Sequence, residues 1–218
     1  MKTLMALIVM VLCVMAVRAD VAMDEMTSAN ELFKKGKVDK AIEIAVKVLA
    51  DDKASDNARG LALARKVQWG GNITPAVIEA ALKDGEALGI TAKRLVVTKV
   101  QLYYFAHDIA RTEQAAIECL PFDVHTACIH LILIAELRGD EAALLKYAEK
   151  GILARPKTSL KNVMDFYWPS LNRGRSLLDS QDQFQLLRKV AYAYPASPGW
   201  EDFSFMVANE AKKAKDLL

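Results

Sequence analysis

The chain has 218 residues, of which 53% are hydrophobic and 26% charged, with only 10 glycines and 6 prolines. This is the composition of an ordered globular protein, and it excludes disordered and collagen-like chains. The formal net charge is +2 and falls to zero without the two basic residues near the N-terminus, Lys2 and Arg18. The chain therefore lacks the overall basic charge expected of a nucleic-acid-binding protein.

Residues 1–19 have the pattern of a secretory signal. Lys2 gives a positive start, residues 4–17 are an unbroken apolar run, and small or tolerated residues precede Asp20. An uncleaved anchor is the alternative, but the run is shorter than the ~20 residues that a helix needs to cross a bilayer. We expect a cleavable signal peptide, cut after Ala19, a mature protein without a transmembrane segment, and a secreted or periplasmic location.

Residues 20–218 are predicted to form a single all-α domain, because apolar residues recur at helical spacing and few strand signals appear. Gly60, Leu63, Ala64 and Val67, for example, share one helix face. Thr74-Pro75 is an N-cap followed by a proline in the first helical position. The predicted helices are 25–36, 38–50, 56–69, 75–88, 91–107, 112–120, 124–138, 140–154, 159–177, 181–194 and 198–216.

These helices make about five antiparallel hairpins and one terminal helix. The hairpins lie near 25–50, 56–88, 91–120, 124–154 and 159–194. The terminal helix, 198–216, carries an apolar stripe and fits a cap that covers the end of a stack. The stripe consists of Trp200, Phe203, Val207, Ala211 and Ala214.

Turn glycines recur at a nearly constant step. Gly36 and Gly71 are 35 residues apart, Gly71 and Gly139 are 68 apart, and Gly139 and Gly174 are 35 apart. A period near 34 residues indicates a helical solenoid. Nine residues after three of these glycines stand small side chains, which we expect to let the second helix of a hairpin approach the first closely: Ala45, Ala80 and Ala148.

Two segments carry a family resemblance. Residues 32–42 read LFKKGKVDKAI, and residues 139–156 combine a turn glycine with the terminating proline Pro156. On these residues the chain resembles the tetratricopeptide repeat family. The middle unit departs from the pattern, with Ala106-His107-Asp108 where the turn glycine is expected. The resemblance implies an α-solenoid, a right-handed superhelical array of hairpins with a concave binding face; a generic antiparallel helical array is the alternative.

The sequence offers few groups for catalysis. It has no nucleophile elbow, phosphate-binding glycine loop, His-Glu-x-x-His or Cys-x-x-Cys motif. The densest polar cluster is His125, Cys128 and His130, but His130 lies about 140° around a helix from His125. We interpret Cys128 and His130 as packed or surface residues, and we predict no catalytic residue, cofactor or metal.

Two cysteines remain after signal removal, Cys119 and Cys128, on either side of the predicted turn at residues 121–123. Antiparallel helices could bring them together, and an oxidising compartment would favour a disulfide. Two buried thiols that never meet are the alternative.

Large amphipathic side chains on the first helices of the third and fifth hairpins are the candidates for binding a partner. Phe105 and Phe166 are interpreted as core, whereas the candidate partner-binding residues are Tyr104, His107, Lys161, Tyr167, Trp168, Arg173 and Arg175. We expect an exported, non-catalytic protein that binds a protein or peptide through its concave face. The alternatives are an assembly subunit of a cell-envelope complex, which would expose a flat apolar patch, and an enzyme on a helical-repeat scaffold.

Overall fold

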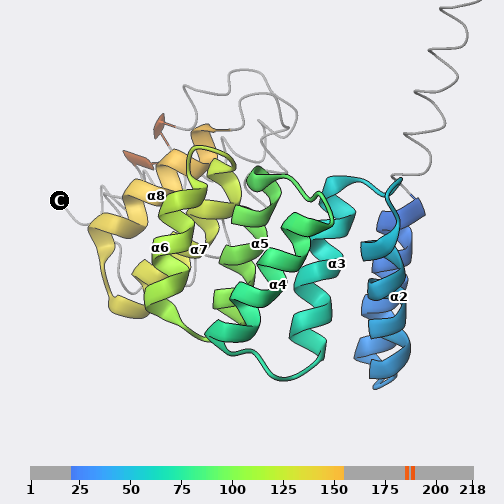
Figure 1. Cartoon of the computed structure of the whole chain (residues 1–218). Coiled ribbons are helices and arrows are strands. Elements are labelled where there is room, and N and C mark those ends of the chain that lie inside the picture. Colours follow the sequence, from blue (N-terminus) through green and yellow to red (C-terminus); the bar gives the residue numbers. More distant parts are fainter. Residues whose placement is uncertain (1–20, 155–184, 187, 190–218) are drawn as a thin grey trace, which may run out of the picture. The chain divides into compact units, whose positions relative to one another are not determined.

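The structure is a computed structural model that describes residues 21–154, 185–186 and 188–189. All regular secondary structure in these residues is helical, without strands, which confirms the all-α prediction (Figure 1). The chain divides into two compact units, residues 1–115 and 116–218. The signal segment, the predicted cap 198–216 and the hairpin 159–194, apart from four helical residues in it, lie outside the described residues.

The helices follow the predicted order. After a helix over residues 21–34, the first unit contains α2 (Val38–Ala50), α3 (Asp56–Trp69), α4 (Pro75–Ala87) and α5 (Ala92–Phe105). The unit boundary falls within α6 (Ile109–Cys119), and the second unit contains α7 (Val124–Arg138) and α8 (Glu141–Leu153). The predicted bounds of α2, α3 and α7 are confirmed.

The start of α6 was not found from the sequence, which places it at residue 112. The helix begins at Ile109 because Asp108 acts as its cap. The backbone N–H of Arg111 donates to the Asp108 carboxylate at 3.0 Å, the geometry of an N-cap and the third residue beyond it. An acidic side chain at this position also interacts favourably with the positive end of the helix dipole.

Hydroxyl caps begin three consecutive helices of the first unit, α3, α4 and α5. Ser55, Thr74 and Thr91 each accept a hydrogen bond from the backbone N–H three residues further on, at 3.2–3.3 Å. The N-cap predicted at Thr74-Pro75 is confirmed. Each such cap stabilises its helix by about 1 kcal/mol, so the starts of α3, α4 and α5 are fixed by local chemistry.

A residue in the left-handed conformation follows the first helix of each predicted hairpin in the described range. These residues are Gly36 (φ 74°), Gly71 (φ 78°), His107 (φ 56°) and Gly139 (φ 67°). Their spacings are 35, 36 and 32 residues. The repeat of turns therefore continues through the middle unit, where the sequence has no glycine.

The turn at His107 has the same hydrogen bonds as a glycine turn. The N–H of His107 donates to the carbonyl of Tyr104 at 3.0 Å, and the N–H of Asp108 donates to that of Tyr103 at 3.1 Å. The corresponding pair at Gly36 measures 2.9 and 3.0 Å. Both pairs are the helix-ending pattern in which two otherwise unpaired carbonyls are satisfied.

The core of the first unit is built around α3, which contacts α2, α4 and α5. Gly60, Leu63, Ala64 and Val67 are all buried, as the helical spacing predicts. A Cβ atom on Gly85 of α4 would lie 2.8 Å from the Leu63 side chain, so the missing side chain lets α4 approach α3.

One prediction of close packing was wrong. Ala45 and Ala148 are fully buried, as expected of small residues between helices, but Ala80 is exposed. In α4 the buried small residues are Ala81 and Gly85 instead. The step from the turn glycine therefore shifts by one residue in this hairpin, which turns Ala80 toward solvent.

Long-range hydrogen bonds of Arg59 and Thr91 join elements of the first unit. The buried Arg59 side chain donates from Nε to the Leu49 carbonyl at 3.3 Å and from Nη2 to the Leu88 carbonyl. These carbonyls lie at the ends of α2 and α4, where helix carbonyls have no partner within the helix. Nearby, the N–H of Thr91 donates to the Asp56 carboxylate at 3.1 Å, linking the starts of α3 and α5.

In the second unit α7 packs against α8. Leu131, Ile132, Leu144 and Ile152 are among its almost fully buried side chains. None of the helices in the described part of the chain is sufficiently long and apolar to cross a membrane.

Candidate functional site

Two of the predicted partner-binding residues lie in the described range, both near the end of α5. Tyr104 is 38% exposed, and its ring lies 6.2 Å from that of Phe105, centroid to centroid. His107 is exposed and forms the left-handed turn, which gives it a backbone role whether or not it contacts a partner. The other candidates lie outside the described residues: Lys161, Tyr167, Trp168, Arg173 and Arg175.

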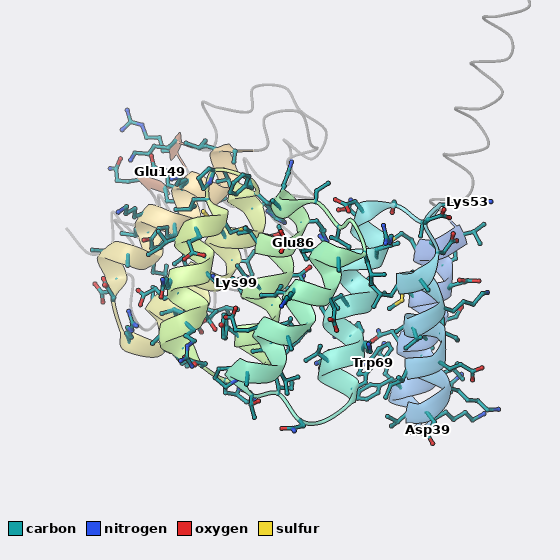
Figure 2. All side chains as sticks on the ribbon, in the orientation of Figure 1. Asp39, Lys53, Trp69, Glu86, Lys99 and Glu149 are labelled. Atoms are coloured by element: carbon teal, nitrogen blue, oxygen red, sulfur yellow. The ribbon has the colours of Figure 1, made fainter. Side chains whose placement is uncertain are left out.

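A row of aromatic residues was missed in the sequence. Phe33, Trp69 and Phe105 each lie in the last turn of a first helix, at steps of 36 residues. The rings of Phe33 and Trp69 stack, with centroids 5.1 Å apart and planes 16° from parallel. Figure 2 shows Trp69 toward the end of the unit that carries Asp39, away from the end with Lys53 and Glu86. The constant spacing of 36 residues between these aromatic residues could have revealed the row from the sequence.

Arg65 of α3 contacts Phe105, the member of this row that lies on α5. Its guanidinium carbon lies 5.4 Å from the centroid of the Phe105 ring, a cation–π contact, and Nη1 donates to the Gln68 side-chain oxygen. Burial lowers the pKa of Arg65, but a guanidinium stays charged at neutral pH. Within the described residues Arg65 makes no ion pair. The groups that contact the Arg65 guanidinium are therefore the Phe105 ring and the side-chain amide of Gln68.

On the same helices, Nε1 of Trp69 and Oε1 of Gln101 are buried and lack a hydrogen-bond partner among the described residues. Trp69 is only 5% exposed, and Gln101 lies one turn before Phe105 on α5. Leaving such a group unpaired costs about 1–3 kcal/mol. We call Phe33, Arg65, Trp69, Gln101, Tyr104 and Phe105 the aromatic face; all six belong to the first unit.

Tyr103, next to the aromatic face in sequence, ties α5 to α4. Its hydroxyl donates to Glu79, and the Arg111 guanidinium lies 5.9 Å from its ring centroid while pairing with Asp108 at 2.9 Å. Burial and the contact with Glu79 raise the pKa of Tyr103 to about 12. The phenol therefore stays protonated at neutral pH, and its role is structural.

The cysteines and His130 are packed inside the second unit. Cys119 and Cys128 are both buried, and no disulfide joins them. Burial raises the pKa of the Cys128 thiol to about 11, so the thiol is not an activated nucleophile. The Nδ1 atom of His130 lies 2.9 Å from the Thr126 carbonyl, and burial lowers the pKa of this imidazole. The described residues hold no cluster of three His, Cys, Asp or Glu placed to bind a metal.

A shallow pocket of about 390 Å³ lies between the helix over residues 21–34 and α2. Lys47 and Glu25, two of its lining residues, pair with each other at 2.7 Å. The remaining lining residues are Val21, Asp24, Ser28 and Ile44. Because its lysine is already paired with Glu25, this pocket offers less to an anionic ligand than Arg65 does.

Comparisons of the chain with family models, curated proteins and solved structures gave no match. The tetratricopeptide resemblance thus depends on the sequence segments quoted above.

Proposed function

We propose that this is an exported, non-catalytic helical-repeat protein that binds a protein or peptide partner through the aromatic face, on the concave side of an α-solenoid. The observation that carries the proposal is the row Phe33, Trp69 and Phe105 with the half-buried Arg65 against it. Aromatic and arginine side chains are the residues that most often dominate binding energy at interfaces. Tyr104 supplies an exposed anchor at the edge of the row.

A repeating fold supports this reading. Turns, helix caps and aromatic residues all recur at similar steps along the first unit, so equivalent side chains from successive hairpins are presented in series. Such surfaces suit extended partners, because each repeat contributes similar contacts. The catalytic alternative would use His107, His125 or nearby aspartates as acid and base. Tyr103, Cys128 and His130 are all buried with a structural explanation for each, so these three residues do not support it.

The assembly alternative requires a continuous exposed apolar patch. Among the described residues of the second unit, which end at 154 apart from four residues between 185 and 189, the exposed large apolar residues are Ile117, Phe122 and Leu137. Phe122 precedes α7 and Leu137 lies at its other end, so the two are about 20 Å apart along a helix with a rise of about 1.5 Å per residue. Separated apolar residues of this kind are common on protein surfaces and favour the aromatic face as the binding site.

A comparison of two single variants tests the proposal. The immobilised protein, Tyr104→Ala and Leu137→Ala are incubated with the extracellular or periplasmic fraction of the native cell, and the captured partner is quantified. Loss of a buried interface tyrosine typically weakens binding roughly 10-fold or more, so we expect Tyr104→Ala to lose the partner that the wild type retains. Leu137→Ala, which removes another exposed side chain, is expected to retain it. The reverse result would favour the assembly alternative.

A further inference from the structure

We propose that the partner segment bound by the aromatic face is acidic, and that an aspartate or glutamate side chain of this segment pairs with Arg65. This inference rests on the proposed function and specifies its partner chemistry. Two properties of Arg65 support it: a charge that no carboxylate of the described residues balances, and a guanidinium whose geometry suits a carboxylate.

The charge of Arg65 is not balanced by a carboxylate within the described part of the chain. Its contacts are the Gln68 amide oxygen and the Phe105 ring, and burial is the cause of its lowered pKa. By contrast, Lys34, Lys47 and Arg111 of the same unit each pair with a carboxylate. A half-buried cation of this kind gains more from an incoming carboxylate than an exposed one does, because water screens the interaction less.

The geometry of the guanidinium suits a carboxylate. The group is planar, offers five N–H donors, and can bind both oxygens of a carboxylate at once. One donor is used by Gln68, and the guanidinium carbon lies 5.4 Å from the centroid of the Phe105 ring. A phosphate group would call for a cluster of arginines, so a single preorganised guanidinium favours a carboxylate.

Two buried atoms of α3 and α5, the donor Trp69 Nε1 and the acceptor Gln101 Oε1, also lack a partner in the described structure. Trp69 is only 5% exposed, so a partner's backbone does not reach its Nε1 without movement of the side chains that cover it. The inference therefore depends on Arg65, and the partner it specifies is an acidic segment whose carboxylate pairs with this guanidinium.

The test selects peptides from a random phage-displayed library with the purified protein as bait. Enriched peptides are synthesised with amidated C-termini in two forms, one with the selected acidic residues and one with Gln and Asn in their place. Affinities are measured by fluorescence anisotropy for the wild type, Arg65→Gln and Lys66→Gln. Lys66 is the matched control, because it is the next residue of α3 and is exposed.

We expect acidic residues to be enriched, and the loss of one charge partner to weaken binding roughly 10-fold or more. Arg65→Gln and the neutral peptide together should lose little more than either alone, because they remove the same contact. Lys66→Gln should retain the affinity. If Arg65→Gln does not fold, Arg65→Lys should bind more weakly with its acidic preference intact, since lysine lacks the planar fork.

Equal binding of neutral and acidic peptides, unchanged affinity in Arg65→Gln, or a requirement for a free C-terminal carboxylate would overturn the inference. If such peptides still lose affinity with Tyr104→Ala, the proposed function stands without this partner chemistry. If the library yields no peptide that binds the wild type, both proposals fail.

Discussion

His107 takes the place of a turn glycine in the third hairpin, so the repeat of turns continues where the sequence has no glycine. It adopts the left-handed conformation that Gly36, Gly71 and Gly139 adopt at the other turns. A residue with a Cβ atom pays about 1–2 kcal/mol for this conformation, and histidine is among the residues that adopt it more readily than most. The turn is therefore preserved at some cost in stability.

We accordingly expect His107→Gly to stabilise the protein by about 0.5–1 kcal/mol, because glycine removes the backbone strain and loses part of that gain through a more flexible unfolded state. His107→Val should destabilise it by more than about 1 kcal/mol, since β-branched residues tolerate this conformation worst. Urea unfolding followed by circular dichroism measures both. A lower midpoint for His107→Gly than for the wild type would show that the imidazole has a stabilising role.

His130 provides a second residue-scale prediction. In the folded state, burial lowers the pKa of its imidazole below the ordinary value of 6.5. The unfolded state therefore binds a proton at a higher pH than the folded state does. The contribution of His130 to stability is then fully present above pH 6.5 and is lost as the pH falls toward the lowered folded-state value.

Stability should thus decrease between pH 7 and lower pH in the wild type, and His130→Gln should flatten this decrease. Ile132→Val, a core change without a titrating group, is the control and should show the wild-type slope at lower overall stability. Thermal melts at a series of pH values give the comparison. An unchanged pH slope in His130→Gln would contradict the assignment.

At the scale of elements, the sequence predicted the helices well because their ends are set locally. Ser55, Thr74 and Thr91 are hydroxyl caps, and glycines end several helices. Both kinds of residue can be recognised in the sequence as helix starts and helix ends. The start of α6 and the packing position of Ala80 were missed. The start of α6 depends on the Asp108 cap, which follows a turn that has no glycine. The exposure of Ala80 depends on a one-residue shift in the packing of α4.

The aromatic face was only partly predictable. The sequence predicts Tyr104 as a partner-binding residue and Phe105 as a core residue, and both stay predictions. Phe33, Arg65 and Trp69 are not among the residues predicted from the sequence to bind a partner. The stacking of Phe33 on Trp69 and of Arg65 on Phe105 joins residues about one repeat apart. Contacts of this kind depend on how neighbouring hairpins pack, which periodicity within one helix does not reveal.

Arg59 gives a prediction at the same scale, because its buried guanidinium satisfies carbonyls at the ends of α2 and α4. Arg59→Met keeps much of the side-chain volume but removes both hydrogen bonds and leaves the carbonyls unpaired. We expect a loss of about 2–4 kcal/mol in unfolding free energy. Lys66→Met, a change at an exposed position of the same helix, should cost less than about 0.5 kcal/mol. Equal effects of the two variants would show that Arg59 does not join the elements.

At the scale of the whole molecule, the two compact units contribute different features. The first unit contains the complete aromatic face, whereas the second contains the buried thiols of Cys119 and Cys128 and the separated apolar residues of its surface. We propose that partner binding takes place in the first unit, without a chemical step in either unit. From the signal-like residues 1–19 we expect this binding outside the cell or in the periplasm.

Site-specific photocrosslinking tests this central claim most directly. A benzoylphenylalanine placed at Tyr104 reports on the aromatic face, and one placed at Lys83, an exposed position on α4, is the control. After irradiation in the native extracellular or periplasmic fraction, we expect a partner protein or peptide to be crosslinked from position 104 and not from position 83. Crosslinks to the same partner from position 83 alone, or equally from both positions, would contradict it.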